Sequence, residues 1–288
     1  MTLLQGMIVL IFAGLFLLFL LLETLYPLRG YKQAFGYRLA INLCLAACAF
    51  VVAAVVVKPV ALFLVTWTSN RAFGLLHLVP LPAMVRFALG FLLMDLTFYY
   101  WHRANHQVPF LWRFHNVHHI DPDLDVSTAF RFHVGEIVFS AGFRIVQIGL
   151  IGPSAFTYLV YESVFQGNTL LHHSNVRLSL RAERLLNTLL VTPRMHGIHH
   201  SVVEEESKSN YGTVFRWWDA LHGSLRLNIP QAAIMIGVPA YLEPADNTLS
   251  HALALPFRKQ RHYWGWADGT RPTRDATEVG GKRSRLVA

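Results

Sequence analysis

Residues 3–22 read LLQGMIVLIFAGLFLLFLLL and carry no charged side chain. A helix of this length spans about 30 Å, which is the thickness of the hydrocarbon core of a bilayer. No basic segment precedes the stretch, and no small-residue cleavage site follows it. The stretch therefore predicts a retained transmembrane helix rather than a cleaved signal peptide.

Three more apolar stretches follow along the chain. Residues 39–57 form a second predicted span, closed by Lys58-Pro59, and residues 83–101 form a third that ends in the aromatic run FYYW. Residues 134–171 are apolar but are interrupted at Gly152-Pro153, which leaves two halves near the lower limit of about 17 residues for a spanning helix. We expect a helical hairpin there, with a shallow re-entrant pair as the alternative.

The composition also indicates a membrane protein. Of the 288 residues, 53% are hydrophobic and 15% are charged, against roughly 25% charged residues in an average soluble domain. The net charge is +8, but the basic residues lie beside apolar runs, which favours anionic lipid headgroups over nucleic acid as neighbours. Cys44 and Cys48 lie inside an apolar stretch and are interpreted as buried or lipid-facing side chains, not as a disulfide.

Basic residues between the first two predicted spans set the expected orientation. Arg29, Lys32 and Arg38 place this loop in the cytoplasm by the positive-inside rule, so the N-terminus is expected outside. The end of the third span then returns to the cytoplasm. Residues 67–82 are predicted as an external loop that dips into the interface, and residues 270–288 as a disordered tail.

The chain contains 15 histidines, and most of them fall in short clusters. Residues 115–119 read HNVHH and residues 196–200 read HGIHH, so the spacing His-x-x-His-His occurs twice. On a helix, the first imidazole of this motif shares a face with both later ones, and the adjacent pair is splayed by about 100°. Residues 102–106 read HRANH, which places two more imidazoles side by side. One splayed motif is therefore able to supply ligands to two different metals.

A metal explains these clusters better than separate structural histidines do. Imidazoles gathered at one membrane face have too few hydrogen-bond partners without a metal, and protonating several of them together produces strong repulsion. Imidazole binds zinc, copper, iron and nickel, but a catalytic zinc site uses only three protein ligands. A set of this size favours a redox-active metal pair. The isolated His77, His222, His251 and His262 are interpreted as ordinary interfacial side chains.

The motifs resemble the membrane fatty acid hydroxylase/sterol desaturase superfamily. The similarity covers roughly residues 85–225, and the histidine boxes follow the order and spacing of that family. The segments that carry it are DLTFYYWHRANH (95–106), FHNVHH (114–119), HHSN (172–175), TPRMHGIHHS (192–201), NYG (210–212) and WWD (217–219).

The resemblance implies a non-haem di-iron centre that uses dioxygen. Members similar to fatty acid 2-hydroxylases have a further histidine where this chain has Asn168, so His173, water or Asn168 itself is left to fill a tenth ligand position. No cytochrome b5-like module precedes the core, which implies a separate electron-transfer protein that is ferredoxin-like or cytochrome b5-like. Carried over position by position, the implied metal ligands are His102, His106, His115, His118, His119, His172, His196, His199 and His200.

Three carboxylates are candidates for supporting the ligands. Asp95 lies seven residues before His102, hence on the same face of a predicted helix, where it would hold a ligand imidazole in one tautomer. An acidic residue in a membrane segment is costly, which indicates a function. Glu136 and Asp219 are further candidates for the same role. His133 is either part of the ligand shell or an ordinary interfacial histidine.

The expected fold is all-α and integral to the membrane, with four to five transmembrane or re-entrant helices and a cytoplasmic helical cap that holds a histidine-rich two-metal site. We divide the chain into N-terminal transmembrane helices with an external loop, a histidine-box catalytic core, and a C-terminal cytoplasmic extension. These parts comprise residues 1–82, 83–225 and 226–288 respectively.

The sequence predicts a dioxygen-dependent oxygenase that hydroxylates or desaturates a C–H bond of a lipid, sterol or fatty-acyl substrate. An unactivated C–H bond is beyond the reach of side-chain acid–base chemistry, so a cofactor must supply the oxidant. The alternative is a histidine-rich membrane metal-handling protein or a zinc-dependent hydrolase. A transporter places its ligands near the midplane of its spans, whereas these histidines lie at or after the span ends, and the chain has no H-E-x-x-H motif.

Overall fold

The computed structural model describes residues 3–274, and the regular elements in this range are all helical, as the sequence predicts. The long helices are α1 (Leu3–Leu25), α2 (Phe35–Val52), α3 (Lys58–Arg71), α4 (Ala83–Gln107), α6 (Val134–Ile151) and α7 (Ala155–His173). The short α-helices are α5 (Pro109–His119), α8 (Leu180–Leu186), α9 (Pro193–His199), α10 (Glu204–Ser207), α11 (Trp217–Leu221) and α12 (Leu249–Ala254). Short 3-10 or π turns are η1 (Ala53–Val57), η2 (Leu75–His77), η3 (Val126–Phe130), η4 (Gln231–Ala233), η5 (Pro239–Tyr241), η6 (Pro244–Asp246) and η7 (Leu255–Phe257).

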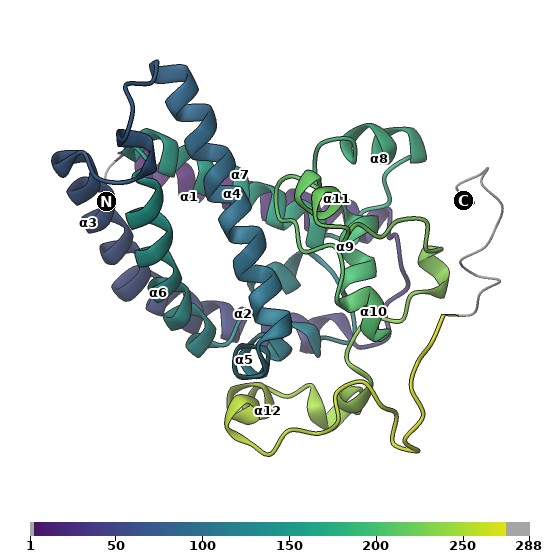
Figure 1. Cartoon of the computed structure of the whole chain (residues 1–288). Coiled ribbons are helices and arrows are strands. Elements are labelled where there is room, and N and C mark those ends of the chain that lie inside the picture. Colours follow the sequence, from purple (N-terminus) through teal and green to yellow (C-terminus); the bar gives the residue numbers. More distant parts are fainter. Residues whose placement is uncertain (1–2, 275–288) are drawn as a thin grey trace.

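The long helices and the short helices occupy opposite sides of the molecule. Figure 1 shows α1, α3 and α6 on the side of the N-terminus, and α8 to α11 on the other side. Helix α6 packs along α2, η1 and α3, and α9 lies against the end of α7. We call the long helices the bundle, and we call α5 together with residues 174–274 the cap.

Four helical segments are long and apolar enough to cross a membrane, which supports an integral membrane protein. Many of their apolar side chains face outward rather than into the protein, as a lipid environment requires. Cys44 and Cys48 are free thiols on the exposed side of α2, which fits the lipid-facing alternative that the sequence allowed. The four segments are Gly6–Leu25, Phe35–His77, Ala83–Gln107 and Val134–Ile151.

The sequence-based prediction for the end of the second span was wrong. The helix does not stop at Lys58-Pro59 but continues through α3 to Arg71. Pro59 lies in the first turn of α3, and the five residues before α3 widen into the π-helix η1, whose shift in register accommodates the missing N–H of the proline. The predicted external loop is correspondingly shorter, because its first residues are helical and only residues 72–82 form turns around η2.

Helices α6 and α7 are joined by a tight turn at Gly152-Pro153, where the sequence predicts one. Of the two helices, α6 is one of the candidate spans, and the choice between a spanning hairpin and a re-entrant pair stays a prediction. Gly152 ends α6 in the left-handed region, with φ of 66°, and a Cβ there would collide with the backbone carbonyl of Phe73. Ser154 caps α7 by accepting a hydrogen bond from a backbone N–H of its first turn. An ion pair of 2.6 Å between Arg144 and Glu162 joins the two helices. The turn therefore returns the outer ends of both helices to the same side of the bundle.

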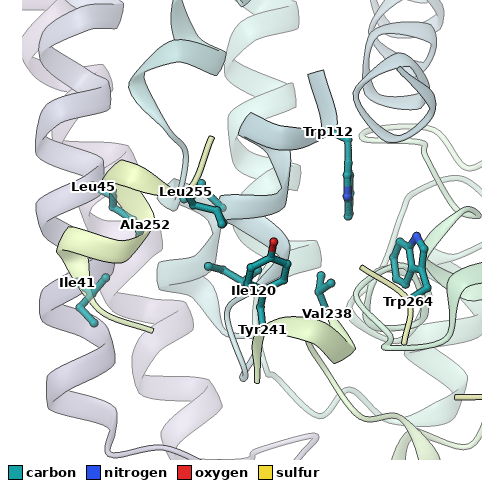
Figure 2. Close-up of a cluster of buried hydrophobic side chains, with 10 residues drawn as sticks. Ile41, Leu45, Trp112, Ile120, Val238, Tyr241, Ala252, Leu255 and Trp264 are labelled. Carbon is teal, nitrogen blue, oxygen red and sulfur yellow. The ribbon is translucent and has the colours of Figure 1, made fainter. Parts of the chain in front are cut away.

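The C-terminal part of the cap packs on α5 and on the start of α2. Figure 2 shows this apolar cluster, in which Trp264 faces Trp112. The two indoles are stacked with 5.6 Å between their ring centroids. Most of the predicted disordered tail, residues 275–288, lies outside the described range. The members of the cluster are Ile41, Leu45, Trp112, Val117, Ile120, Val238, Tyr241, Ala252, Leu255 and Trp264.

Candidate metal centre

Four helices carry the histidines of the boxes, and they meet at the boundary between the bundle and the cap. Helix α4 supplies two histidines in its last turns, α5 supplies three, α7 ends in two, and α9 supplies two with a third directly after it. All of these side chains are buried. They are His102, His106, His115, His118, His119, His172, His173, His196, His199 and His200.

Nine of these histidines form two groups, each of a size that suits one metal ion. Within each group, the ring nitrogens all lie within 4.8 Å of one another. The five-histidine group consists of His102, His106, His115, His119 and His199. The four-histidine group consists of His118, His173, His196 and His200.

Both His-x-x-His-His motifs contribute to both groups. His118 belongs to the four-histidine group, whereas its neighbour His119 belongs to the five-histidine group. His199 and His200 divide in the same way. Successive residues of a helix point about 100° apart, so two adjacent imidazoles reach toward different groups. The two groups therefore interlock along both motifs.

His172 lies outside both groups, although the family resemblance implies that it is a ligand. Its ring is 4.2 Å from the ring of His196, and its Nδ1 atom is 3.4 Å from the amide nitrogen of Asn168. The next residue, His173, points into the four-histidine group, where its Nε2 atom lies 3.1 Å from that of His118. A ligand role for His172 stays a prediction, and the geometry gives its place in the group to His173.

Distances within the four-histidine group fit a shared metal ion. The Nε2 atom of His196 lies 3.0 Å from that of His173 and 3.1 Å from that of His200. Two ligands at right angles, each about 2.1 Å from a metal, are about 3.0 Å apart. Such close nitrogens need either a proton or a metal between them.

Unpaired ring nitrogens in both groups also fit metal binding. Among residues 3–274, seven nitrogens of the two groups are buried without a hydrogen-bond partner. Buried polar atoms without partners are rare in proteins and call for an explanation, and a metal ion satisfies those that face the centre of each group. The seven are both nitrogens of His106, Nε2 of His115, His119 and His199, and Nδ1 of His196 and His200.

The histidines of the cap are held in their neutral form. Burial lowers the pKa of His118, His119 and His200 well below its ordinary value, and the neighbouring imidazoles add to the effect. Burial also lowers the pKa of His199 to about 3. Because metal ions bind the neutral imidazole, the protein holds these side chains in the protonation state that a metal requires.

Backbone carbonyls hold four of the imidazoles through their Nδ1 atoms. A carbonyl only accepts hydrogen bonds, so Nδ1 carries the proton and Nε2 presents its lone pair to the centre of the group. The distances from Nδ1 to the carbonyl oxygen are 2.8 Å for His102 and Tyr211, 2.7 Å for His199 and Ser209, 2.9 Å for His173 and Thr169, and 3.3 Å for His118 and Arg131.

Glu136 is the predicted carboxylate that contacts a ligand imidazole directly. Its Oε1 atom lies 2.8 Å from Nδ1 of His115, and both side chains are buried. Glu136 lies in the first turn of α6, where the helix dipole stabilises a negative charge. A carboxylate at this place fixes the tautomer of His115 and raises the basicity of its other nitrogen.

Asp95 does not hold an imidazole, contrary to the sequence-based prediction. It shares a face of α4 with His102, but two helical turns correspond to about 10 Å along the axis, which is farther than a carboxylate reaches. Its Oδ2 atom instead accepts hydrogen bonds from the Trp218 indole, at 2.7 Å, and from the backbone N–H of Phe215, at 3.1 Å. Asp95 therefore fixes the part of the cap around Phe215 and Trp218 against α4.

Asp219 also acts on the backbone rather than on a histidine, again contrary to the prediction. Its two oxygens accept hydrogen bonds from the backbone N–H groups of Tyr211 and Gly212, each at 2.8 Å. Since the carbonyl of Tyr211 holds His102, Asp219 is a positioning residue one step away from that imidazole.

His133 and Asn168, whose roles the sequence left open, lie outside both groups. The Nδ1 atom of His133 accepts a hydrogen bond from the backbone N–H of Gly135 and caps α6. The side-chain amide of Asn168 donates to the carbonyl of Thr213 at 2.6 Å. Asn168 therefore supports the same cap loop that Asp95 fixes from the other side.

The carbonyl acceptors of Ser209 and Tyr211 could not be identified from the sequence. They flank Asn210, which has a left-handed backbone with φ of 54° and whose side-chain amide donates to two further carbonyls. The motif NYG encodes this turn. Asparagine tolerates a positive φ, and at Gly212 a Cβ would lie 2.8 Å from a carboxylate oxygen of Asp219. The motif does not reveal that one of its carbonyls faces His102.

A buried charged network ties α2 to the loop that follows α5, and it too was not anticipated. Arg38 is fully buried and forms ion pairs with Asp121, at 2.8 Å, and with Asp125. Asn42 and Thr128 donate to the same carboxylate of Asp121, at 3.1 and 2.9 Å. Breaking a buried ion pair costs about 3–5 kcal/mol. Arg38 is therefore an internal anchor for the segment after the first histidine motif, not a free charge at the membrane surface.

Comparison with known proteins places the histidine groups inside a known domain. Residues 87–224 match the family model for fatty acid hydroxylase. The chain is 32% identical over 179 residues to the ornithine lipid hydroxylase OlsE of Rhizobium tropici, a match that covers 62% of this chain and 52% of that protein. It is 29% identical over 163 residues to the alkylglycerol monooxygenase of Homo sapiens, covering 56% and 34%. It is 28% identical over 138 residues to the human cholesterol 25-hydroxylase, covering 47% and 49%.

The chain spans about half or less of the length of these curated relatives. No solved structure matches it. The region that matches the family model contains every histidine of the two groups.

Proposed function

Residues 87–224 belong to the fatty acid hydroxylase family, and from this premise we propose that the chain is a membrane oxygenase that hydroxylates a C–H bond of a lipid. The observation that carries the proposal is the pair of interlocking histidine groups at the end of the bundle. The relatives are named as hydroxylases or monooxygenases of ornithine lipid, alkylglycerol and cholesterol. We infer a lipid, sterol or fatty-acyl substrate, and the metal-handling and zinc-hydrolase alternatives receive no support.

We propose that each histidine group holds one iron ion. Iron supplies the activation of dioxygen that side chains alone cannot provide. In a hydroxylation, one oxygen atom of O2 enters the C–H bond and the other leaves as water, with two electrons and two protons supplied from outside. Desaturation would consume the same electrons and protons but release two waters.

The part of this chain's own residues in the reaction is to orient the ligands and to exclude water. Glu136 and the backbone carbonyls fix the rings from behind. The indole of Trp112 lies 4.9 Å from the ring of His106, and the ring of Phe132 stacks on His118 at 4.7 Å. A shell of aromatic side chains controls the access of solvent to a metal site.

The position of the two groups suits a substrate that lies in the membrane. Helices α4 and α7 both carry ligand candidates at their C-terminal ends, and α4 is one of the four candidate spans. A lipid whose tail lies among the acyl chains would meet the centre at the membrane boundary. This placement favours a membrane lipid over a soluble metabolite as the substrate.

We further propose that the cap faces the cytoplasm and receives electrons from a separate ferredoxin-like or cytochrome b5-like protein. Arg29 and Lys32 lie in the loop between α1 and α2, and the backbone N–H of Lys32 donates at 2.9 Å to Asp123, in the loop that follows α5 of the cap. This contact supports a common side of the membrane for this loop and the cap, and the positive-inside rule favours the cytoplasm for that side. A cysteine at Arg226 should react with an impermeant maleimide only after permeabilisation, whereas labelling in intact cells would contradict the orientation.

The test of the proposed function is the metal content together with the product. Protein purified without oxygen should contain close to two iron ions per chain, one for each histidine group. With an electron donor and isotopically labelled dioxygen, it should transfer one labelled oxygen atom to a lipid. Protein that contains zinc, lacks iron and releases only hydrolysed lipid would refute the proposal.

A further inference from the structure

Four large apolar side chains form an exposed face on the cap. Leu185 in α8 is 73% exposed and Leu189 just after it 39%, while Trp217 and Leu221 of α11 are 44% and 73% exposed. The indole N–H of Trp217 donates to the carbonyl of Thr188 at 3.2 Å, so the two segments lie side by side. Figure 1 shows α8 and α11 next to each other at this edge of the cap. We call these four side chains the α8–α11 face.

The face lies at the level of a membrane span rather than beyond its end. The ring of Phe215 lies 5.8 Å from that of Phe91, and the Trp218 indole donates to Asp95. Phe91 and Asp95 both belong to α4, which is one of the four candidate spans. Phe91 precedes His102 by eleven residues, about 16 Å along the helix axis. Helix α11 therefore lies alongside the apolar part of α4.

The chain that leads into α11 is buried inside the bundle. Val214 is fully buried in a cluster with Met94 of α4 and Tyr161 of α7. Leu190 and Phe215 pack against the same cluster. The inner side of the chain at Val214 therefore packs between α4 and α7. Its outer side faces the surroundings of these helices.

Charged side chains accompany the α8–α11 face in the pattern of a helix that lies on a bilayer. Arg181 and Arg184 are exposed on α8, next to Leu185. Long basic side chains extend from an apolar surface to the polar headgroups and attract anionic lipids. A face that combines exposed leucine and tryptophan with arginine fits a lipid interface.

We propose that α8 and α11 are immersed in the leaflet on the cap's side of the membrane. The α8–α11 face contacts acyl chains there, and Arg181 and Arg184 reach the phosphate groups. The loop that leads into α11 carries the carbonyl of Tyr211 that holds His102, so the immersion sets the depth at which the histidine groups meet a lipid. This inference rests on the packing of the chain and does not depend on the proposed reaction.

The experiment measures the surroundings of two residues of the face. Single cysteines at Leu185 and Leu221, in a chain with Cys44→Ala and Cys48→Ala, are labelled with a nitroxide in vesicles of phosphatidylcholine and phosphatidylglycerol. Electron paramagnetic resonance then compares collisions with dioxygen, which concentrates among acyl chains, and with a water-soluble nickel chelate. Labels at Leu10 of α1 and at Asp268, both exposed, are the lipid and water references.

We expect dioxygen collisions to exceed nickel collisions at Leu185 and Leu221, as at Leu10, with the reverse at Asp268. Higher nickel accessibility at both positions would overturn the proposal and place the face in water. Low accessibility to both reagents, with dipolar broadening between labels on two chains, would overturn it in favour of a contact between two copies. Metal content is measured on the same samples, so that a failure of the proposed iron site is distinguishable from a failure of this inference.

Discussion

The five-histidine and four-histidine groups draw on the same two motifs, yet the protein holds them in different ways. In the five-histidine group backbone carbonyls hold His102 and His199, and a carboxylate, Glu136, additionally holds His115 at 2.8 Å. The anchors found for the four-histidine group, those of His118 and His173, are backbone carbonyls. In addition, the imidazoles of the four-histidine group contact one another through their Nε2 atoms, at 3.0 to 3.1 Å.

This difference suggests that the two groups have unequal affinities for metal. One group offers five imidazoles and a negative charge behind them, and the other offers four imidazoles with neutral anchors. A carboxylate behind a ligand imidazole raises its basicity. We therefore expect the five-histidine group to bind its metal more tightly.

Removing one ligand from each group should have the largest effect. We expect His118→Ala to lose the iron of the four-histidine group, because three imidazoles remain, and His199→Ala to weaken but not abolish iron binding, because four remain. Both variants should lose more than about 100-fold in turnover, since even the outer partners of ligands contribute about 10–100-fold. Elemental analysis and Mössbauer spectroscopy count the irons, and His262→Ala is the matched control. Equal iron loss in the two variants would contradict unequal affinities.

Glu136→Gln should reduce the difference between the groups. Glutamine keeps the shape of the side chain but removes the charge behind His115, so we expect the affinity of the five-histidine group to fall by about 10–100-fold. A chelator titration of the purified protein, followed by iron analysis, measures the change. Glu205→Gln, at an exposed position, is the control. Unchanged affinity would mean that the number of ligands, and not the anchoring charge, distinguishes the groups.

Asp219→Asn should have a smaller effect that is confined to the five-histidine group. The amide cannot accept both backbone N–H groups, and an unsatisfied buried donor costs about 1–3 kcal/mol of folding free energy. The ligand His102 is reached only through the backbone of Tyr211, so iron retention should fall less than in Glu136→Gln. Thermal unfolding followed by iron analysis checks both. Loss of iron from the four-histidine group instead would contradict the assignment of Asp219 to the five-histidine group.

The membrane helices were largely predictable from the sequence because a bilayer selects for length and apolar composition alone. The first and third predicted spans are helices as expected, and the turn near Gly152 is present. The stop at Lys58-Pro59 was wrong because a proline breaks a helix only where its N–H is needed, and here a π-turn removes that need. Rules that predict a helix end from one residue fail where the hydrogen-bond register of the helix changes.

The histidine motifs were also readable, because ligands three and four residues apart on one helix share a face whatever surrounds them. The same rule failed for Asp95, since residues that share a face are not necessarily within reach of each other. It also could not choose between His172 and His173, because the choice depends on how α7 is rotated against its neighbours.

The amino-acid sequence by itself determined that this is a membrane protein with two splayed histidine motifs, since hydrophobic length and helical spacing are properties of short segments. Only the tertiary structure decided which imidazoles gather around which centre and what holds them. His102 is held by the carbonyl of Tyr211 and Arg38 by Asp121, across 109 and 83 residues of chain. Every residue has a backbone carbonyl, so no residue type marks the one that faces a ligand, and packing alone brings such distant partners together.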